Sequence, residues 1–298
     1  MLKLKNDFNI FSLSKRINRP LLLDGAMGSL LQQKGVKPHE YLWMSIANIT
    51  HSDLVTEIHK DYINAGADII TTNTFNTNPT DTKENKKYSS DKLVKRAVRC
   101  AKNAVANMPV LIAGSNAPAE DCYQAERTVS KRELEQNHKK HIDLLMENGV
   151  HFILNETHSH FDEIFIISNY CDKRNIPYAI SLFFTDNLKL LSGEKLSEIL
   201  RFLNDSNALA VGFNCILPST MDKAKNKITF PENWGLYLNC GDGSFTDVDI
   251  KCGVSPEIYS DIIKEYLRYS PSYIGSCCGS SPEHIKEIKK ILDGQHYN

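Results

Sequence analysis

The sequence lacks the features that mark several large classes of protein. No apolar run approaches the roughly 20 residues that a helix needs to cross a bilayer, and charged residues interrupt the N-terminal stretch before the core of a signal peptide is formed. Neither sign of charge is in excess, because 35 Lys and Arg face 36 Asp and Glu, for a formal net charge of -1. No basic block is present to follow a phosphate backbone. We therefore expect a cytoplasmic protein with no membrane or nucleic-acid partner.

Cysteine is too sparse for a disulfide scaffold, with 8 residues in a chain of 298. No Cys-x-x-Cys pair occurs, which excludes finger-like and thioredoxin-like motifs. The remaining composition, 41% hydrophobic and 24% charged, is that of an ordinary globular protein, and the length is ample for a full hydrophobic core. No change of composition marks a linker, so we expect residues 1–298 to form one domain with its core at about 20–294.

The chain repeats an alternation of strand and helix patterns. Eight short apolar runs bounded by Gly, Asn, Thr or Pro predict strands at 21–25, 68–75, 110–115, 151–157, 178–184, 208–215, 234–240 and 273–279. Helical spacing follows each run and predicts helices at 53–65, 91–107, 130–148, 161–173, 195–204, 219–227, 256–269 and 282–292. Asp53, Asp91 and Ser130 are the expected N-caps of three of these helices.

Eight strand-helix units favour a closed (β/α)8 barrel, the TIM barrel, of the α/β class. An open doubly wound sheet is the competing architecture, because periodicity alone does not show closure. Two longer connections, residues 28–52 and 116–129, follow the first and third strands. In a barrel they lie at the carboxyl ends of the strands, where active sites are built.

Three cysteines fall at the ends of predicted strands. Cys215 ends the sixth strand, and Cys277 and Cys278 end the eighth, with glycines on either side of the pair. In a barrel these thiols reach one face, and three soft ligands with one open position describe a catalytic Zn²⁺ site. The alternative is that they are small apolar side chains in the core.

The chain resembles the homocysteine S-methyltransferase family over nearly its whole length. The resemblance rests on DGAMGS at 24–29, AGADIITTNTF at 65–75, GFNC at 212–215 and GSCCGSSPEHI at 275–285. It implies a (β/α)8 fold, Zn²⁺ held by Cys215, Cys277 and Cys278, and homocysteine as methyl acceptor. Ser276 departs from the family pattern, which usually has glycine before the cysteine pair.

The resemblance also implies residues that hold the amino-acid end of homocysteine. Acidic residues at the ends of the first and fourth strands, Asp24 and Glu156, are assigned to the ammonium group. From the sequence alone, without the resemblance, a helix cap or an ion pair is the favoured explanation of such carboxylates. Backbone amides of a glycine-bearing turn are suited to the carboxylate. The remaining candidates for the acceptor pocket are Ala26, Met27 and Gly28 of that turn, with Thr72, Asn73 and Asn214.

Other residues have weaker claims to the site. His158 and His160 have a spacing that can bind metal, and Cys240 or Cys122 is a possible additional ligand, although packing explains each of them. The aromatic residues Tyr41, Trp43 and Phe75 are candidates to contact a sulfonium cation.

The methyl donor is not specified by these motifs. Because the barrel accounts for the chain length, the family resemblance favours a sulfonium donor, S-methylmethionine or S-adenosylmethionine, with methionine as product. One alternative is a free-standing homocysteine module that takes methyl from a separate corrinoid or folate protein, because NTFNTN at 73–78 resembles the methionine synthase version of that segment. Another is a thiolate zinc-binding barrel without turnover. The oligomeric state remains open.

Overall fold

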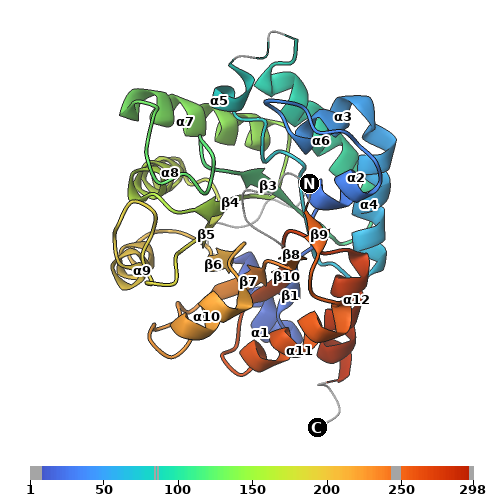
Figure 1. The fold of residues 1–298 in the computed structure, drawn as a ribbon, viewed down its shortest axis with the longest axis vertical. Helices are drawn as coiled ribbons and strands as arrows, with labels where there is room; N and C mark the ends of the chain where they lie inside the picture. The colour runs from blue at the N-terminus through green and yellow to red at the C-terminus, as the bar shows by residue number, and fades with distance from the viewer. Residues whose placement is uncertain (1–8, 84, 86, 243–249, 295–298) are drawn as a thin grey trace.

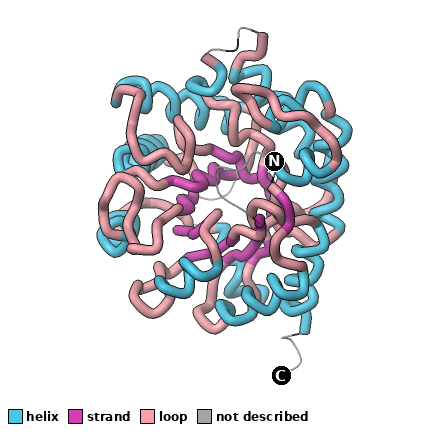
Figure 2. Tube along the Cα trace, viewed as in Figure 1, coloured by secondary structure: helices cyan, strands magenta, loops and turns pink. Residues whose placement is uncertain are grey.

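Eight parallel strands form a barrel at the centre of the computed structural model, which describes residues 9–83, 85, 87–242 and 250–294. The helices lie around this barrel (Figures 1 and 2). The strands are β1 Leu21–Leu22, β2 Ile69–Thr71, β3 Leu111–Asn116, β4 Phe152–His158, β5 Tyr178–Leu182, β6 Val211–Asn214, β7 Trp234–Leu238 and β10 Tyr273–Ser276. Six of them fall within the runs predicted as strands, and β3 and β4 each extend one residue past the end of the predicted run.

The barrel is closed between its first and second strands. The sheet order is β1-β10-β7-β6-β5-β4-β3-β2, and a parallel bridge between Leu23 and Ile69 joins the two ends. The amide of Asp24 donates to the carbonyl of Ile69 at 3.0 Å, and the amide of Asp68 donates to the carbonyl of Leu22 at 2.7 Å. The predicted (β/α)8 barrel is therefore confirmed, and the open sheet is excluded.

Twelve α-helices accompany the strands in the described residues. They are α1 Leu13–Ile17, α2 Gly28–Gln33, α3 Ala47–Thr50, α4 Ser52–Asn64, α5 Pro79–Thr82, α6 Ser90–Val105, α7 Lys131–Glu147, α8 Phe161–Arg174, α9 Leu196–Asn204, α10 Pro218–Ala224, α11 Pro256–Leu267 and α12 Pro282–Gly294. The eight predicted helices correspond to α4 and α6 to α12. No described helix combines the length and apolar character needed to cross a membrane.

The predicted N-caps are correct at one helix and wrong at two. Ser130 accepts from the amide of Glu133, whose side chain accepts in return, so α7 begins with a capping box. Helix α6 is instead capped by Ser89, and Asp91 lies in its first turn, where a carboxylate still favours the helix dipole. Asp53 is likewise in the first turn of α4.

A segment that the strand-helix pattern did not predict closes the amino-terminal end of the barrel. It consists of the short 3-10 helix η1, Ile10–Ser12, and α1. Phe11 is 1% exposed, and its ring lies 5.5 Å from Phe152 and 4.9 Å from Tyr273, both on the barrel strands. With this end filled by side chains, the carboxyl ends of the strands are left for a ligand cavity.

Candidate metal and substrate site

A cavity of about 770 Å³ opens at the carboxyl ends of the barrel strands. This volume lies in the range of about 300–1,000 Å³ found for small-molecule sites. Strand ends from β1, β2, β3, β4, β6, β7 and β10 contribute to its wall. The longer connections 28–52 and 116–129 also line it, as the sequence predicts.

The cavity contains the three cysteines singled out in the sequence. The sulfur atoms of Cys215, Cys277 and Cys278 all lie within 4.8 Å of one another, and among the described residues they form the one group of at least three possible metal ligands. The sulfurs of Cys215 and Cys278 are 3.5 Å apart. Two thiolates on one tetrahedral ion with bonds of about 2.3 Å are separated by roughly 3.8 Å. The donor set and its spacing thus fit a thiophilic ion such as Zn²⁺.

Local backbone conformation brings these thiols together. Cys215 follows β6 with φ at 54°, in the left-handed region that a non-glycine residue rarely adopts. Gly279 follows the cysteine pair with φ at 81°, and a Cβ there would lie 2.6 Å from the backbone of Gly241. Glycine is required at this position because both the conformation and the close approach exclude a side chain.

Ser276, the departure from the family pattern, is accommodated within β10. It pairs in register with Leu238 of β7, and its φ is not positive, so the backbone needs no glycine. The side chain is 3% exposed, and its hydroxyl has no hydrogen-bond partner in the described part of the chain. Ser276 therefore adds a buried hydroxyl to the cavity wall without straining the strand.

Asp24 is held in a fixed orientation at the end of β1. The amide of Thr71 donates to its Oδ2 at 2.8 Å, and the hydroxyl of the same residue donates to Oδ1 at 2.6 Å. Burial raises the pKa of Asp24 to about 8, although both hydrogen bonds from Thr71 oppose this shift. A cation that reaches the cavity is therefore favoured at this carboxyl group.

Glu156 is the second carboxyl group in the wall, and it is partly buried. The hydroxyl of Ser115 on β3 donates to Oε1, and the hydroxyl of Tyr237 on β7 donates to Oε2 at 3.4 Å. Burial raises the pKa of Glu156 to about 7. Ser115 and Tyr237 have no signal in the sequence, because neither lies in a motif and only closure of the barrel brings three strands to one carboxyl group.

One of the three backbone amides that are predicted to bind the acceptor carboxylate makes a hydrogen bond within the protein instead. Ala26, Met27 and Gly28 line the cavity, but the amide of Ala26 donates to the hydroxyl of Ser280 at 3.0 Å. The Ala26 amide is therefore occupied by a contact between the first and last βα units. The amides of Met27 and Gly28 remain candidates to bind the acceptor carboxylate.

Three polar residues predicted for the pocket are engaged in contacts with the protein. Thr72 and Asn73 line the cavity, but the Thr72 hydroxyl accepts from the Ser115 amide, and the Asn73 side chain donates to the Met44 carbonyl at 3.1 Å. Asn214 is fully buried and is not among the lining residues; it bonds to Thr157 instead. The Asn214 side chain is thus directed to strand β4 and is unavailable to a ligand.

His158 and His160 do not converge on a metal site. The Nε2 of His160 lies 3.1 Å from the Ala125 carbonyl, and that of His158 lies 3.2 Å from the Asn116 carbonyl. The other ring nitrogen of His158 lies 3.8 Å from Glu163, at the start of α8. Both histidines therefore support the protein structure.

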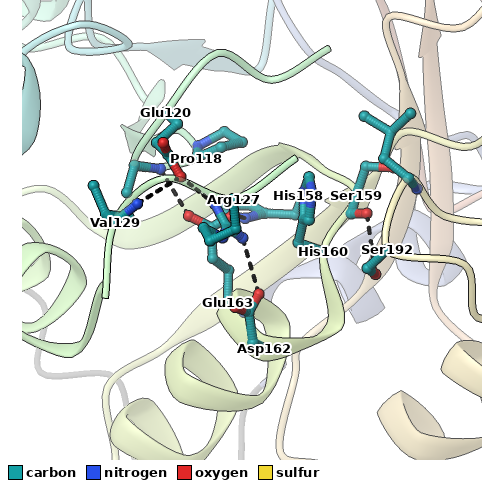
Figure 3. A network of polar contacts seen from close by, with 12 residues as sticks. Pro118, Glu120, Arg127, Val129, His158, Ser159, His160, Asp162, Glu163 and Ser192 are labelled. Carbon is teal, nitrogen blue, oxygen red and sulfur yellow. Dashed lines mark hydrogen bonds and ion pairs between the residues drawn. The ribbon is translucent and has the colours of Figure 1, made fainter. Parts of the chain in front are cut away.

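Glu163 is the centre of a buried polar network that fixes the 116–129 connection (Figure 3). It accepts from the Ala119 amide at 2.8 Å and lies 3.0 Å from Nε2 of His138 and 3.3 Å from the guanidinium of Arg127. Burial opposes ionisation, but the hydrogen bond with His138 holds the pKa of Glu163 well below its usual value. Arg127 also pairs with Glu120, so both ends of the connection are anchored.

This anchored connection places Cys122 and Tyr123 in the cavity wall. The side chain of Tyr123 hydrogen-bonds to Cys215, a contact that has no signal in the sequence. Burial raises the pKa of Cys122 well above its usual value, and its thiol lies outside the three-sulfur group. Cys240 is fully buried, and its sulfur lies 3.8 Å from the Leu238 carbonyl, which agrees with packing.

The fold and the site together define a (β/α)8 barrel whose strand ends present three thiols and the carboxyl groups of Asp24 and Glu156 to one cavity. The chain belongs to the homocysteine S-methyltransferase family, whose model matches residues 21–292, and is thus classed with the methyltransferases. It is 22% identical to homocysteine S-methyltransferase 2 of Arabidopsis thaliana, with 91% of this chain and 92% of the relative covered. Selenocysteine Se-methyltransferase of Brassica oleracea var. italica is 22% identical, with 97% and 94% covered.

A solved structure shows the same fold. The metallated form of the homocysteine methyltransferase MmuM from Escherichia coli superposes with a TM-score of 0.79 and 23% identity, covering 94% of this chain and 99% of that one.

Proposed function

We propose that this protein transfers a methyl group from a sulfonium donor, S-methylmethionine or S-adenosylmethionine, to the thiol of homocysteine, and that it holds Zn²⁺ through Cys215, Cys277 and Cys278. The observation that carries this proposal is the composition of the cavity. Three clustered thiols share it with seven carboxyl groups, and none of its described lining residues is Lys, Arg or His.

The acceptor is bound close to the thiols in this proposal. When bound there, Zn²⁺ lowers the pKa of a coordinating thiol, so that homocysteine is presented as a thiolate at neutral pH. Asp24 and Glu156 are suited to the acceptor ammonium group, because each is a carboxyl group in the cavity wall held by hydroxyl donors. The amides of Met27 and Gly28 are suited to the acceptor carboxylate.

The charge of the cavity favours a cationic donor. Seven acidic residues line it, namely Asp24, Glu40, Asp81, Glu120, Asp121, Glu156 and Asp242. No cationic side chain among the described lining residues opposes these carboxyl groups, so the cavity favours a sulfonium ion over an anionic folate. Tyr41, Trp43 and Phe75 add aromatic faces, whose electron-rich surfaces attract a cation.

The space for Trp43 depends on the glycine at position 28. A Cβ at Gly28 would lie 2.2 Å from the indole of Trp43, so only glycine lets the ring pack over the start of α2. Trp43 itself adopts φ of 39°, an uncommon conformation that is consistent with a ring positioned for binding.

The reaction requires positioning more than proton transfer by a side chain. The acceptor sulfur forms a bond to the methyl carbon as the bond from that carbon to the donor sulfur breaks, and its electron pair leaves with the thioether. Charges of opposite sign on the acceptor and donor are neutralised together, which a water-poor cavity favours. The walls hold the two substrates in line, and the acceptor proton is lost to solvent before transfer.

The experiment is a measurement of methionine formation by the purified, zinc-loaded protein with each donor separately. We expect turnover with S-methylmethionine in the absence of cobalamin, folate or any second protein. The free-standing homocysteine module would replace this proposal if no methionine formed with S-methylmethionine, S-adenosylmethionine or betaine, and methionine did form when a methylated corrinoid protein was added. No turnover under any of these conditions would favour the zinc-binding barrel without activity.

A further inference from the structure

Asp81 differs from the other six carboxyl groups of the cavity. Asp24, Glu120 and Glu156 accept hydrogen bonds from neighbouring side chains. Glu40, Asp121 and Asp242 are exposed at the rim, where water satisfies them. Asp81 is partly buried, and it is the cavity carboxyl group with a buried oxygen, Oδ2, that has no hydrogen-bond partner in the described part of the chain.

The local fold accounts for only part of Asp81. The residue lies in the first turn of α5, and its amide donates to the side chain of the N-cap residue Asn78 at 3.0 Å. Burial raises the pKa of its carboxyl group, and the Asn76 side chain and the Asn78 backbone act in the opposite direction. The cap leaves Oδ2 without a hydrogen-bond partner, although a buried oxygen without a donor costs free energy.

The position of Asp81 separates it from the expected acceptor site. Asp24 and Glu156 lie in the ring of strand ends with the thiols, whereas α5 follows β2 and is fixed against α7 by hydrogen bonds from Thr80 to Asn137 (Figure 1). In-line transfer needs the donor on the far side of the methyl carbon from the acceptor sulfur. A group such as Asp81, which lies outside the ring of strand ends, can bind the donor on that far side.

We propose that Asp81 binds the α-ammonium group of an amino-acid sulfonium donor. This inference rests on the proposed function and adds the recognition of one part of the donor. An ammonium group supplies the hydrogen-bond donor and the positive charge that Oδ2 lacks. Burial raises the pKa of Asp81 well above its usual value, as expected for a carboxyl group without a cationic partner.

The test compares S-methylmethionine with 4-(dimethylsulfonio)butanoate, which is the same molecule without its amino group. Calorimetric titration of the zinc-loaded protein should show tighter binding of S-methylmethionine by about tenfold. In D81N, this preference should fall to less than about twofold, while the homocysteine KM and the zinc content stay unchanged. E40Q is the matched control, because it removes one negative charge at the exposed rim and should keep the preference.

Two outcomes would overturn the inference while leaving the proposed function in place. One is equal binding of the two sulfonium compounds by the unmodified protein, a result that does not depend on the folding of any variant. The other is turnover with S-methylmethionine in D81N with an unchanged preference for the amino group. Failure of the proposed function is recognised separately, by the absence of turnover with either S-methylmethionine or S-adenosylmethionine in the unmodified protein.

Discussion

The three clustered thiols predict a metal content that depends on particular cysteines. We expect one zinc per chain, and we expect Cys277→Ser to lose both zinc and activity, because removal of one of three thiolates leaves the ion without its donor set. Cys122→Ser is the matched control and should retain zinc, since the thiol of Cys122 lies in the same cavity but outside the three-sulfur group. Elemental analysis of the two variants, purified without chelator, measures the zinc content of each.

Full zinc content in a variant with both Cys215 and Cys277 replaced by alanine would contradict the assignment. Loss of zinc in Cys122→Ser would instead add that thiol to the ligand set.

The carboxyl group of Glu156 in the cavity wall predicts a selective effect on binding of the acceptor. Glu156→Gln removes the charge that is proposed to pair with the homocysteine ammonium group, and loss of such a partner costs on the order of 2 to 5 kcal/mol. The homocysteine KM or Kd should rise, while zinc content and donor affinity stay close to those of the unmodified protein. Unchanged acceptor binding with loss of zinc or of folding would identify Glu156 as a structural residue.

Asp24 predicts a dependence of stability on pH. Its pKa is raised from 3.8 to about 8 by burial, so between these values the folded protein keeps a proton that the unfolded chain releases. Stability therefore falls as the pH rises through this window, by at most about 1.4 kcal/mol per pH unit. Asp24→Asn removes this dependence, and its free energy of unfolding relative to the unmodified protein should increase between pH 5 and pH 7.

Urea denaturation of the two chelator-treated proteins measures this difference, because the contributions of all other titrating groups are common to both. If the difference in free energy of unfolding between the two proteins stayed constant from pH 5 to pH 7, Asp24 would titrate near its usual value.

At the level of structural elements, the connection that covers the cavity depends on one buried carboxylate at the start of α8. The side chain of Glu163 is fully buried, and Glu163→Gln removes a charge from the network with Arg127 and His138. We expect a loss of about 3 kcal/mol in the free energy of unfolding. Asp162→Asn is the control, because Asp162 pairs with the same arginine but is 45% exposed, and it should cost about 1 kcal/mol or less.

The same pair of variants tests whether this network positions the cavity wall. Alkylation of Cys122, measured by mass spectrometry, should become faster in Glu163→Gln and should not change in Asp162→Asn. Equal stability and equal alkylation in the two variants would show that the network does not hold the connection.

For the whole molecule, the prediction of a single domain is open to a direct test. The chain has two tryptophans, Trp43 in the connection after β1 and Trp234 in β7. Each can be observed alone after replacement of the other by phenylalanine, with the free energy of unfolding of each variant measured by circular dichroism. We expect the fluorescence transition to coincide with the circular dichroism transition in both variants, because a one-domain barrel unfolds cooperatively. Separate transitions would divide the chain into independent units.

The sequence alone determined the alternating strands and helices, because each is encoded by periodicity over a few neighbouring residues. Its pattern also placed the three cysteines at strand ends, and its resemblance to a family singled out Asp24 and Glu156. Only the tertiary structure decided that the barrel closes and that Phe11 fills its amino-terminal end. It also decided that Ser115 and Tyr237 converge on Glu156. The same holds for the contact of Tyr123 with Cys215 and for the unpartnered oxygen of Asp81. These features join segments far apart in the chain, and a contact that depends on the packing of distant elements leaves no periodic pattern in the local sequence.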